Sequence, residues 1–473
     1  MPPGMAGQKG KGDKLNSSVS SVNLSDAIDR APLKALQYGV FLLCLLLLLA
    51  DGFDAQALGY VVPVMAHQWG IKPAMFAPAF SAGLVGMAIG ALALGAFADY
   101  AGRRKIIVLC TVVVGAVTFA MGAVTDMTQL MVLRFVAGLG LGGLMPNALA
   151  LAAEYCPTRA RSTVVMIASC GISLGSALGG IVAGMVLHAQ GWQAVFHFGG
   201  LMSLALTVIT LVALPESIRY RALREGRSPS LDRLIRRICP DLQLGADTRI
   251  AINEEKPSGI TIGQLFTQGR TRQTLLLWTI YFMCLLEIYV FASWLPTVLI
   301  RGGVGLRTSV FATSALQIAG TIAALTLGGL LERRNPGRIV AWLYLIGVVG
   351  IVGIAMTVST PWMLVLATAC AGFGIVGAQA GTHAIASRSY PTFMRSTGMG
   401  WALGIGRIGS VIGPLIGGAL LVMNWSTSNL LLVTTIPPLF AACAAWAMAP
   451  RVEGDAAARE LPEGGSQTAV RFE

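Results

Sequence analysis

The amino-acid sequence predicts an all-α, polytopic membrane protein with twelve membrane-spanning helices in two pseudo-symmetric six-helix bundles, and with both termini in the cytoplasm. The chain of 473 residues is 55% hydrophobic and 12% charged, whereas soluble domains carry roughly 25% charged residues. Its apolar residues form separate runs that are long enough to cross a bilayer, and its two halves resemble each other. A chain of this composition needs lipid around its apolar surface.

A membrane-crossing helix needs about 20 mostly apolar residues. In the first half of the chain, the runs that meet this length are 36–65, 78–98, 106–124, 129–152, 163–187 and 193–214. In the second half they are 274–299, 309–331, 339–358, 362–386, 397–422 and 428–448. We therefore expect a disordered cytoplasmic tail (1–33), two helical bundles (34–214 and 274–448), a cytoplasmic central linker (215–273) and a cytoplasmic C-terminal tail (449–473).

The positions of Lys and Arg indicate the orientation of the helices, because cytoplasmic loops are enriched in both. With a cytoplasmic N-terminus, the inner loops contain Arg103, Arg104, Lys105, Arg159, Arg161, Arg333, Arg334, Arg338, Arg388 and Arg395. The outer connections near 125, 190, 360 and 425 contain neither residue, and only Lys72, Arg301 and Arg307 break the pattern. The net charge of +12 is then a topology signal facing anionic lipid, and no nucleic-acid partner is expected.

The second half of the chain repeats the first at an offset of about 234 residues. PTRARSTV (157–164) aligns with PTFMRSTG (391–398), GSALGG (175–180) with GSVIGP (409–414), and GAFADYAGRR (95–104) with GLLERRNPGR (329–338). Asp54 aligns with Glu287, and Pro63 with Pro296. Two six-helix halves related by a parallel repeat are typical of transporters that alternate around a site between the halves.

Two acidic residues interrupt the first apolar run, LLLLLADGFDAQALGYVVPV (45–64). A spacing of three residues places Asp51 and Asp54 on one face of a helix. Burial and a like-charged neighbour favour a protonated carboxyl group, whereas a nearby arginine favours the charged form. Such a pair can bind and release a proton. The alternative is that either acid only caps or kinks the helix near Gly52.

An arginine lies inside the fourth run, MTQLMVLRFVAGLGLGGLMPN (127–147). Arg134 is about 10 Å from the outer boundary by helix rise. Because an arginine within the membrane costs about 2.5–3.5 kcal/mol on insertion scales, we expect Arg134 to face a partner or a wet cavity rather than to reach the headgroups. Four glycines should let a neighbouring helix pack closely: Gly138, Gly140, Gly142 and Gly143.

The segment GAFADYAGRRK (95–105) connects the second and third runs on the basic side. Gly95 would allow close helix approach and Gly102 a tight turn. We expect Asp99, Arg103 and Arg104 to form a cytoplasmic gate that pairs across the interface between the halves, although a generic basic loop is the alternative. Glu154, Arg161 and Arg395 are assigned to the same gate, whereas LPES (214–217) is expected to be a helix end without chemistry.

At 95–105 the chain resembles the major facilitator superfamily, whose second loop has the pattern G-x-x-x-D-(x)-x-G-R-(K/R), and the resemblance covers nearly all of 34–448. The sequences D-G-F-D (51–54) and YPTFMRSTGMGWALGIGRIGSVIGPLIGG (390–418) resemble the aromatic acid:proton symporters within it. This resemblance implies a monomeric carrier of the bacterial cytoplasmic membrane that imports a hydroxybenzoate-like carboxylate with protons and no other cofactor. Tyr100 departs from the family, which usually has an arginine there.

Within this resemblance, Arg134 is implied in proton coupling and Arg407 in substrate binding. Arg407 falls about 16 Å into its helix, and a planar guanidinium can bind a carboxylate with two hydrogen bonds; a structural ion pair is the alternative. The other candidate substrate contacts are Asp54, Gln56, Tyr289, Trp294, Gln317 and Gln379. The candidate proton-coupling residues are Asp51, Asp54, Arg134 and Glu287. His383 is expected to make a structural hydrogen bond, with a proton relay as the alternative.

Other functions fit the sequence less well. A carrier or exporter of another organic anion, such as a phthalate, a sialic acid or a sugar acid, is the nearest alternative. An enzyme is not expected, because the four histidines are far apart and no HExxH, GxSxG or phosphate-binding loop is present. The eight cysteines are scattered without a CxxC pair, so no metal site is expected. A sensor would need an output domain, and the central segment is a basic linker.

Overall fold

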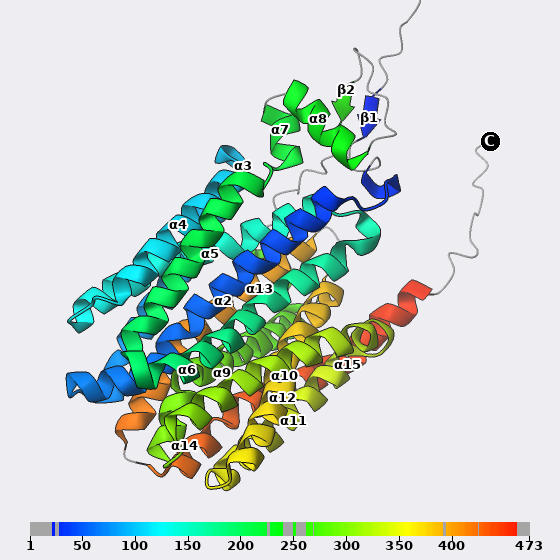
Figure 1. The fold of residues 1–473 in the computed structure, drawn as a ribbon. Coiled ribbons are helices and arrows are strands. Elements are labelled where there is room, and N and C mark those ends of the chain that lie inside the picture. Colours follow the sequence, from blue (N-terminus) through cyan, green and yellow to red (C-terminus); the bar gives the residue numbers. More distant parts are fainter. Residues whose placement is uncertain are drawn as a thin grey trace, which may run out of the picture.

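The computed structural model describes residues 21–23, 28–224, 228–239, 249–251, 262–267, 269–390, 394–423 and 425–460. Figure 1 shows a bundle of long helices that run roughly parallel to one another. The long helices of the first half are α2 (Ala35–Trp69), α3 (Ala77–Ala101), α4 (Arg103–Met121), α5 (Met127–Glu154) and α6 (Thr158–Ala213). Those of the second half are α9 (Thr271–Arg301), α10 (Leu306–Arg333), α11 (Pro336–Thr357), α12 (Pro361–Ser389), α13 (Arg395–Val422), and the pair α14 (Thr427–Val433) and α15 (Ile436–Glu460).

Eleven helices of the described chain are long and apolar enough to cross a membrane. The helix α6 accounts for the difference from the expected twelve, because its 56 residues contain two crossings. At Gly191 the backbone has φ +77° and ψ −180°, which is not helical. The two predicted runs on either side of residue 190 are therefore the two legs of α6, joined at a glycine kink rather than by a loop. The prediction of twelve crossings in two bundles is confirmed.

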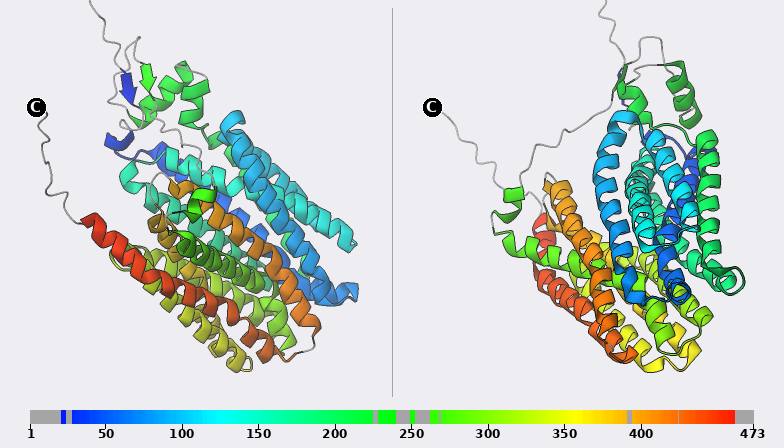
Figure 2. Two further views of the ribbon diagram at one scale, coloured as in Figure 1. Left: turned by 180° about the vertical axis from the view of Figure 1, so that it is seen from behind. Right: turned by 90° about the vertical axis from the view of Figure 1, so that its left-hand side faces the viewer.

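The two halves pack mainly within themselves. In the first half, α2 packs on α6, α3 on α5, and α4 on both α5 and α6. In the second half, α11 and α10 pack on α12, and α9 packs on α13 and α15. The halves meet where α6 contacts α10, α3 contacts α13, and α2 contacts α9. The right-hand view of Figure 2 shows the blue-to-cyan helices on one side and the orange-to-red helices on the other.

The helices begin where the sequence supplies partners for free backbone N–H groups, which is the usual role of residues at a helix N-terminus. The Asp126 side chain accepts a hydrogen bond from Gln129 N at 2.9 Å, and α5 starts there. The Asn335 side chain accepts from Gly337 N at 2.9 Å at the start of α11. The helices α11 and α12 carry proline in their first turn, where its missing N–H costs nothing.

The N-terminal end of α2 and the C-terminal end of α15 lie at the same end of the bundle (Figure 1). The connections α3–α4, α5–α6, α10–α11 and α12–α13 also reach this end, and they carry the basic residues of the predicted inner loops. We call it the Arg-rich end. The predicted grouping of these loops on one side is therefore present in the fold.

Part of the predicted central linker is ordered at the Arg-rich end. It forms α7 (Ile218–Arg224), α8 (Pro229–Ile238), the strand β2 (Arg249–Ala251) and the 3-10 turn η2 (Ile262–Phe266), and β2 pairs in parallel with β1 (Ser21–Asn23). The helix α8 buries Leu231, Leu234, Ile235 and Ile238. The helix α15 extends past residue 448, where the last apolar run ends. The rest of the two tails and of the linker lies outside the described residues.

Glycines set the distance between the central helices of the first half. A Cβ atom on Gly175 of α6 would overlap the carbonyl oxygen of Leu49 on α2, and one on Gly52 of α2 would overlap that of Ile172 on α6. The glycine-rich face of α5 is used in the same way, because Cβ atoms on Gly138 and Gly142 would overlap the carbonyl oxygens of Gly83 and Met87 on α3. The expected close packing at these glycines is confirmed.

We expect Gly175→Ala to destabilise the protein, because the added methyl group must push α2 and α6 apart. Overpacking of this kind costs about 1–3 kcal/mol. The matched control is Gly39→Ala on α2, where nothing lies within 4 Å of the added carbon. Thermal unfolding of the detergent-purified variants measures the difference. Equal midpoints for the two variants would contradict the close contact.

Candidate functional site

Asp54 and Arg134 lie together in the core of the first half. Arg134 Nη1 donates to the Asp54 carbonyl oxygen at 3.1 Å, and Nη2 donates to that of Ala55 at 3.3 Å. The Asp54 carboxylate accepts from Ser203 Oγ at 3.3 Å, while its Oδ1 atom is buried without a hydrogen-bond partner. The exposed fractions of Asp54 and Arg134 are 1% and 7%. Arg134 therefore faces a partner inside the protein, as the sequence predicted.

Asp51 lies one helical turn before Asp54, also near the middle of α2, and is 4% exposed. Its Oδ1 atom is buried without a hydrogen-bond partner. Asp51 is near enough to Asp54, and to Arg407 on α13 in the other half, for their charges to interact with it. The two acids and two arginines thus come from α2, α5 and α13 and form one charged cluster. We call these four residues the central cluster.

Arg407 and Tyr289 meet the first half at a methionine. Arg407 Nη1 contacts Met87 Sδ at 3.0 Å, and the Tyr289 hydroxyl contacts the same sulfur at 3.9 Å. A thioether is only a weak acceptor. Met87 was not predicted, because a methionine in an apolar helix usually has a packing role and nothing in its sequence neighbourhood distinguishes it.

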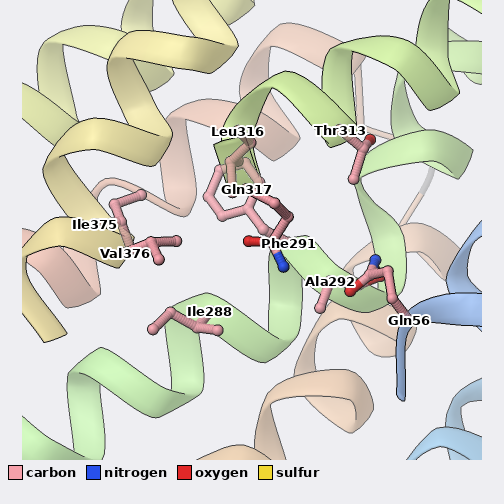
Figure 3. Close-up of a pocket in the computed structure, with 9 residues that line it drawn as sticks. All are labelled: Gln56, Ile288, Phe291, Ala292, Thr313, Leu316, Gln317, Ile375 and Val376. Atoms are coloured by element: carbon pink, nitrogen blue, oxygen red, sulfur yellow. The ribbon is translucent and has the colours of Figure 1, made fainter. Parts of the chain in front are cut away.

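Two small cavities lie between the halves. One has a free volume of about 20 Å³ and is lined by Met87, Arg134, Tyr289 and residues around them. The other has about 10 Å³ and is lined by Gln56, Phe291, Gln317, Val376 and their neighbours (Figure 3). A single water molecule needs about 10–15 Å³ of such space. Neither of these two cavities has room for an aromatic ring in this conformation.

Of the remaining candidate substrate residues, two line the smaller cavity and two lie outside both cavities. Gln56 lines the smaller cavity and donates to the Ala292 carbonyl oxygen at 2.5 Å, and Gln317 lines the same cavity. Trp294 is 2% exposed, donates to the Pro414 carbonyl oxygen at 2.9 Å and packs edge-on against Phe80 at 5.2 Å. Its place is in the packed core between α3 and α9. Gln379 is half-buried on α12 and lines neither of the two cavities.

Glu287 lies apart from the central cluster. It is 1% exposed, and both carboxylate oxygens are buried without a hydrogen-bond partner. Its polar neighbours are Cys284, one turn earlier on α9, and Thr434 at the end of α14. Both belong to the second half, so Glu287 faces the core of its own bundle.

The hydrogen bonds between the halves lie from the middle of the bundle towards the end opposite the Arg-rich end. Besides those of Gln56 and Met87, Ser81 Oγ near the start of α3 donates to the Val411 carbonyl oxygen at 2.8 Å. A Cβ atom on Gly180 of α6 would overlap Ser314 Oγ of α10, also in this part of the bundle. The halves are therefore held together at and beyond the central cluster.

The basic residues of the predicted gate pair within the first half rather than across the interface. Arg103 Nε forms an ion pair with Glu154 at 3.1 Å, and Arg103 Nη2 contacts Asp99 at 3.5 Å. Glu154 also accepts from Ser217 Oγ at 2.5 Å. Among the described residues, neither of these ion pairs joins the two halves. Arg103 therefore pairs with acids of its own half in this conformation.

Glu216 of the LPES stretch is a structural partner rather than a plain helix end. Its Oε1 atom accepts from the N–H of Arg104 and of Ser217, both at 2.9 Å, and its carbonyl oxygen accepts from the Tyr155 hydroxyl at 2.7 Å. Gly102 has φ +103° where α3 ends and α4 begins, which confirms the predicted tight turn. The sequence alone did not show that Glu216 would fold back onto this turn.

We expect Glu216→Ala to destabilise the first half, because it leaves two buried or half-buried N–H groups without an acceptor. A loss of this kind costs about 1–3 kcal/mol. Asp99→Ala is the control, since the side chain of Asp99 is 74% exposed and makes one contact at 3.5 Å. A thermal unfolding midpoint that falls equally in both variants would rule out the role of Glu216.

Three other gate candidates lie elsewhere. Nothing lies within 4 Å of a Cβ atom built on Gly95, so this glycine does not serve close helix approach in this conformation. Arg161 is exposed near Asp29 rather than near Arg103. Arg395 is half-buried at the start of α13, and its Nε atom has no hydrogen-bond partner.

The segment before α2 is fixed to the start of α6 by Asp29. Its carboxylate accepts from Thr158 N at 2.6 Å and from Thr158 Oγ1 at 2.7 Å. The hydrogen bond from the Thr158 N–H, followed by that from its hydroxyl, lowers the pKa of Asp29 from its usual value. Asp29 thus caps a helix whose own N-cap residue is Pro157, which has no side-chain acceptor.

Comparisons with known proteins agree with this fold. Residues 44–378 match the model of the Major Facilitator Superfamily. The chain is 37% identical to the 4-hydroxybenzoate transporter PcaK of Acinetobacter baylyi over 90% of this chain and 94% of that protein. It is 37% identical to a gallate transporter of Pseudomonas putida over 89% of this chain and 94% of that protein.

Among solved structures, a bacterial homologue of the human lysosomal transporter Spinster superposes with a TM-score of 0.69. It shares 15% sequence identity and covers 90% of this chain and 99% of that one. The nucleoside transporter NupG superposes with a TM-score of 0.67 at 14% identity over 87% of this chain and 99% of that one. The chain is a multi-pass membrane transport protein rather than an enzyme, and it belongs to the Major Facilitator Superfamily.

Proposed function

We propose that the protein imports an aromatic carboxylate, such as a hydroxybenzoate, together with protons by alternating access. The observation that carries this proposal is the central cluster: two acids and two arginines from both halves meet at the middle of the membrane-spanning bundle. Charged groups at this depth are costly and usually mark an ion or substrate pathway. The relatives named as 4-hydroxybenzoate and gallate transporters support the substrate class.

Arg407 is the proposed anchor for the substrate carboxylate. Its guanidinium faces a weak acceptor, Met87 Sδ, which a carboxylate can displace with two charge-assisted hydrogen bonds. Tyr289 lies beside the same sulfur and offers a ring for stacking and a hydroxyl for hydrogen bonding. Because Met87 belongs to the first half and Arg407 to the second, a substrate here touches both halves.

Asp54 and Asp51 are the proposed proton carriers. Arg134 binds the backbone of Asp54 and Ala55 rather than the carboxylate, so a proton on Asp54 does not break these hydrogen bonds. Arg407 is the second cation of the cluster, and a bound substrate anion would compete with Asp51 for its charge. Substrate binding would then favour a protonated carboxyl group, which couples the two events.

The proposal includes a location and an orientation. We place the protein in the bacterial cytoplasmic membrane as a monomer, with the Arg-rich end in the cytoplasm, because basic loops favour that side. The two bundles would be 34–214 and 274–448, joined by the linker 215–273. The hydrogen bonds between the halves lie towards the opposite end, so in this conformation the halves are closed on the outer side.

Transport of radiolabelled 4-hydroxybenzoate into proteoliposomes tests the proposal. We expect uptake that is driven by an inward proton gradient and abolished by a protonophore. Competition by benzoates, phthalates, sialic acids and sugar acids distinguishes the alternative organic anions, and reversed gradients distinguish an exporter. Uptake that does not respond to the proton gradient would exclude proton coupling.

A further inference from the structure

The second half contains an acidic site that the central cluster does not use. Glu287 is almost fully buried near the middle of α9, and neither of its oxygens has a hydrogen-bond partner. Isolated buried charge is among the most unfavourable arrangements in a protein. A proton supplies the neutralising charge that no neighbouring side chain provides, so the surroundings of Glu287 suit a carboxyl group that binds a proton.

The internal repeat shows how this site differs from that of Asp54. The sequence AGLGLGG (137–143) aligns with AGFGIVG (371–377), and this register places Thr368 at the position of Arg134. Asp54 faces Ser203 on the last crossing of its half, and Glu287 faces Thr434 on the last crossing of the other. The two halves therefore keep the acid and its hydroxyl neighbour, whereas only the first half keeps the arginine.

A row of polar groups connects Glu287 with the Arg-rich end. Thr274, Tyr281, Cys284 and Glu287 are spaced by seven, three and three residues, so each lies within about 60° of the next and the row winds gradually around α9. The row covers about 20 Å by helix rise. All four side chains are buried, with exposed fractions of 3% or less. A series of polar groups inside an otherwise apolar core needs a reason, because apolar residues would pack there at lower cost.

Side chains from other helices complete this row. The Tyr281 hydroxyl hydrogen-bonds His383 Nδ1 of α12 at 2.8 Å, and the Tyr390 hydroxyl donates to Thr274 Oγ1 at 3.2 Å. The Tyr344 hydroxyl of α11 lies beside Cys284 and has no hydrogen-bond partner. His383 is exposed at the protein surface, so the row reaches the surface through its ring. Hydroxyl, thiol and imidazole groups can all pass protons.

We propose that Glu287 is a second proton-binding site, reached from the Arg-rich end through Tyr281 and His383. The proposal rests on the proposed function, in which the Asp51–Asp54 pair carries one proton. With Glu287 carrying another, two protons enter with each monoanionic substrate. Each cycle then moves one net positive charge, and the membrane potential adds to the driving force.

The titratable side chains near Glu287 come from α9, α11 and α12. On α9 they are Tyr281 and Cys284, on α11 Tyr344, and on α12 His383. The charged residues of α2 and α13 near this depth are Asp51, Asp54 and Arg407, which belong to the central cluster. Thr434, the C-cap residue of α14, is the neighbouring hydroxyl group from the last crossing.

Glu287→Gln tests the proposal in proteoliposomes, because glutamine keeps the shape and cannot carry the proton. Uptake is measured with a pH gradient at zero potential, and with a potential of about 100 mV at equal pH. We expect Glu287→Gln to retain pH-driven uptake and to lose about 50-fold in potential-driven accumulation, which is the value of one transferred charge at that potential. A variant that remains sensitive to the potential, or a wild type that is insensitive, would overturn the proposal.

This design separates the proposal from the function on which it rests. If the wild type shows no proton-driven uptake at all, the proposed function fails. If uptake by the wild type is proton-driven and Glu287→Gln still moves the same net charge with each substrate, only the proposal of a second site fails. Substrate exchange without any gradient shows that the variant is folded and active.

Two further measurements complete the test. Labelling of the wild-type protein does not depend on the folding of a variant, and a second variant tests the route of the proton. Carbodiimide reacts with protonated carboxyl groups, so labelling of Glu287 in the wild-type protein is expected to decrease as pH rises. Labelling that is absent at every pH would contradict the site.

Tyr281→Phe should slow potential-driven uptake by roughly tenfold or more. The matched control is Tyr60→Phe, whose buried hydroxyl donates to the Ser176 carbonyl oxygen at 2.9 Å outside the row. Equal rates would exclude the route through Tyr281.

Discussion

Arg407→Lys is expected to abolish uptake of the aromatic acid while leaving the protein in the membrane, and Arg407→Ala is expected to do the same. The guanidinium of Arg407 lies at the interface of the halves, with Met87 Sδ at 3.0 Å from Nη1. Lysine keeps the charge but loses the planar fork that binds both oxygens of a carboxylate. Removing one partner of a buried charged pair costs about 2–5 kcal/mol, so uptake at low substrate concentration should fall by roughly 30-fold or more.

Binding of 4-hydroxybenzoate to the purified variants, measured by calorimetry, distinguishes a binding defect from a folding defect. Arg301→Lys is a suitable control, because Arg301 is exposed and donates through Nη1 to the Leu421 carbonyl oxygen at 2.9 Å, away from the cluster. We expect the control to bind as the wild type does. If Arg407→Lys transports normally, Arg407 has only a structural role.

Composition and repetition determined most of the fold, because each crossing needs a long apolar run and each connection needs a polar break. The kink in α6 was harder to locate, since Gly191 bends the helix without the polar loop that the scan expects. The last crossing lies at Thr427–Ala449, as predicted, but α15 itself continues past the apolar run to Glu460. Lipid-facing composition therefore predicts crossings better than it predicts helix ends.

Arg134, Asp54 and Asp51 were predictable because a charge in an apolar run is costly and has to meet a partner. Met87 was not, since nothing in an apolar helix shows which methionine faces a cation. The gate was expected to pair across the interface between the halves, whereas Arg103 pairs with Glu154 of the same half, a residue that the sequence already assigned to the gate. Charge indicates that these residues pair, but only the fold shows which surface they share.

Glu287 shows the limit of reasoning from the repeat. Its alignment with Asp54 correctly predicts a buried acid on the equivalent helix. The alignment does not show which neighbours the second half has replaced. Thr368 stands where the first half has Arg134, so the two acids have different surroundings. Sequence equivalence thus locates the side chain, while its neighbours on other helices determine its chemistry.

Asp54→Asn is expected to remove the proton of the central cluster and to slow proton-driven uptake by roughly 100-fold, the scale of a missing proton-transfer group. Asparagine can still accept a hydrogen bond from Ser203, whose Oγ atom lies 3.3 Å from Asp54 Oδ2, and the backbone hydrogen bonds from Arg134 do not involve the side chain. The variant should therefore fold and bind substrate, and it should exchange internal for external substrate when no gradient is applied. Because asparagine cannot take up a proton, accumulation loses the contribution of this proton and keeps at most that of a proton on Glu287.

The measurement compares gradient-driven uptake with exchange in the same proteoliposomes. Asp126→Asn is the control, because Asp126 caps α5 at its exposed end, about two helical turns before Arg134 and outside the central cluster. Asp51→Asn distinguishes the two acids: if the pair shares one proton, either substitution removes accumulation, and if Asp54 alone carries it, Asp51→Asn retains part of it. Full accumulation by Asp54→Asn would show that the proton is carried elsewhere, and the coupling proposed for the central cluster would then be wrong.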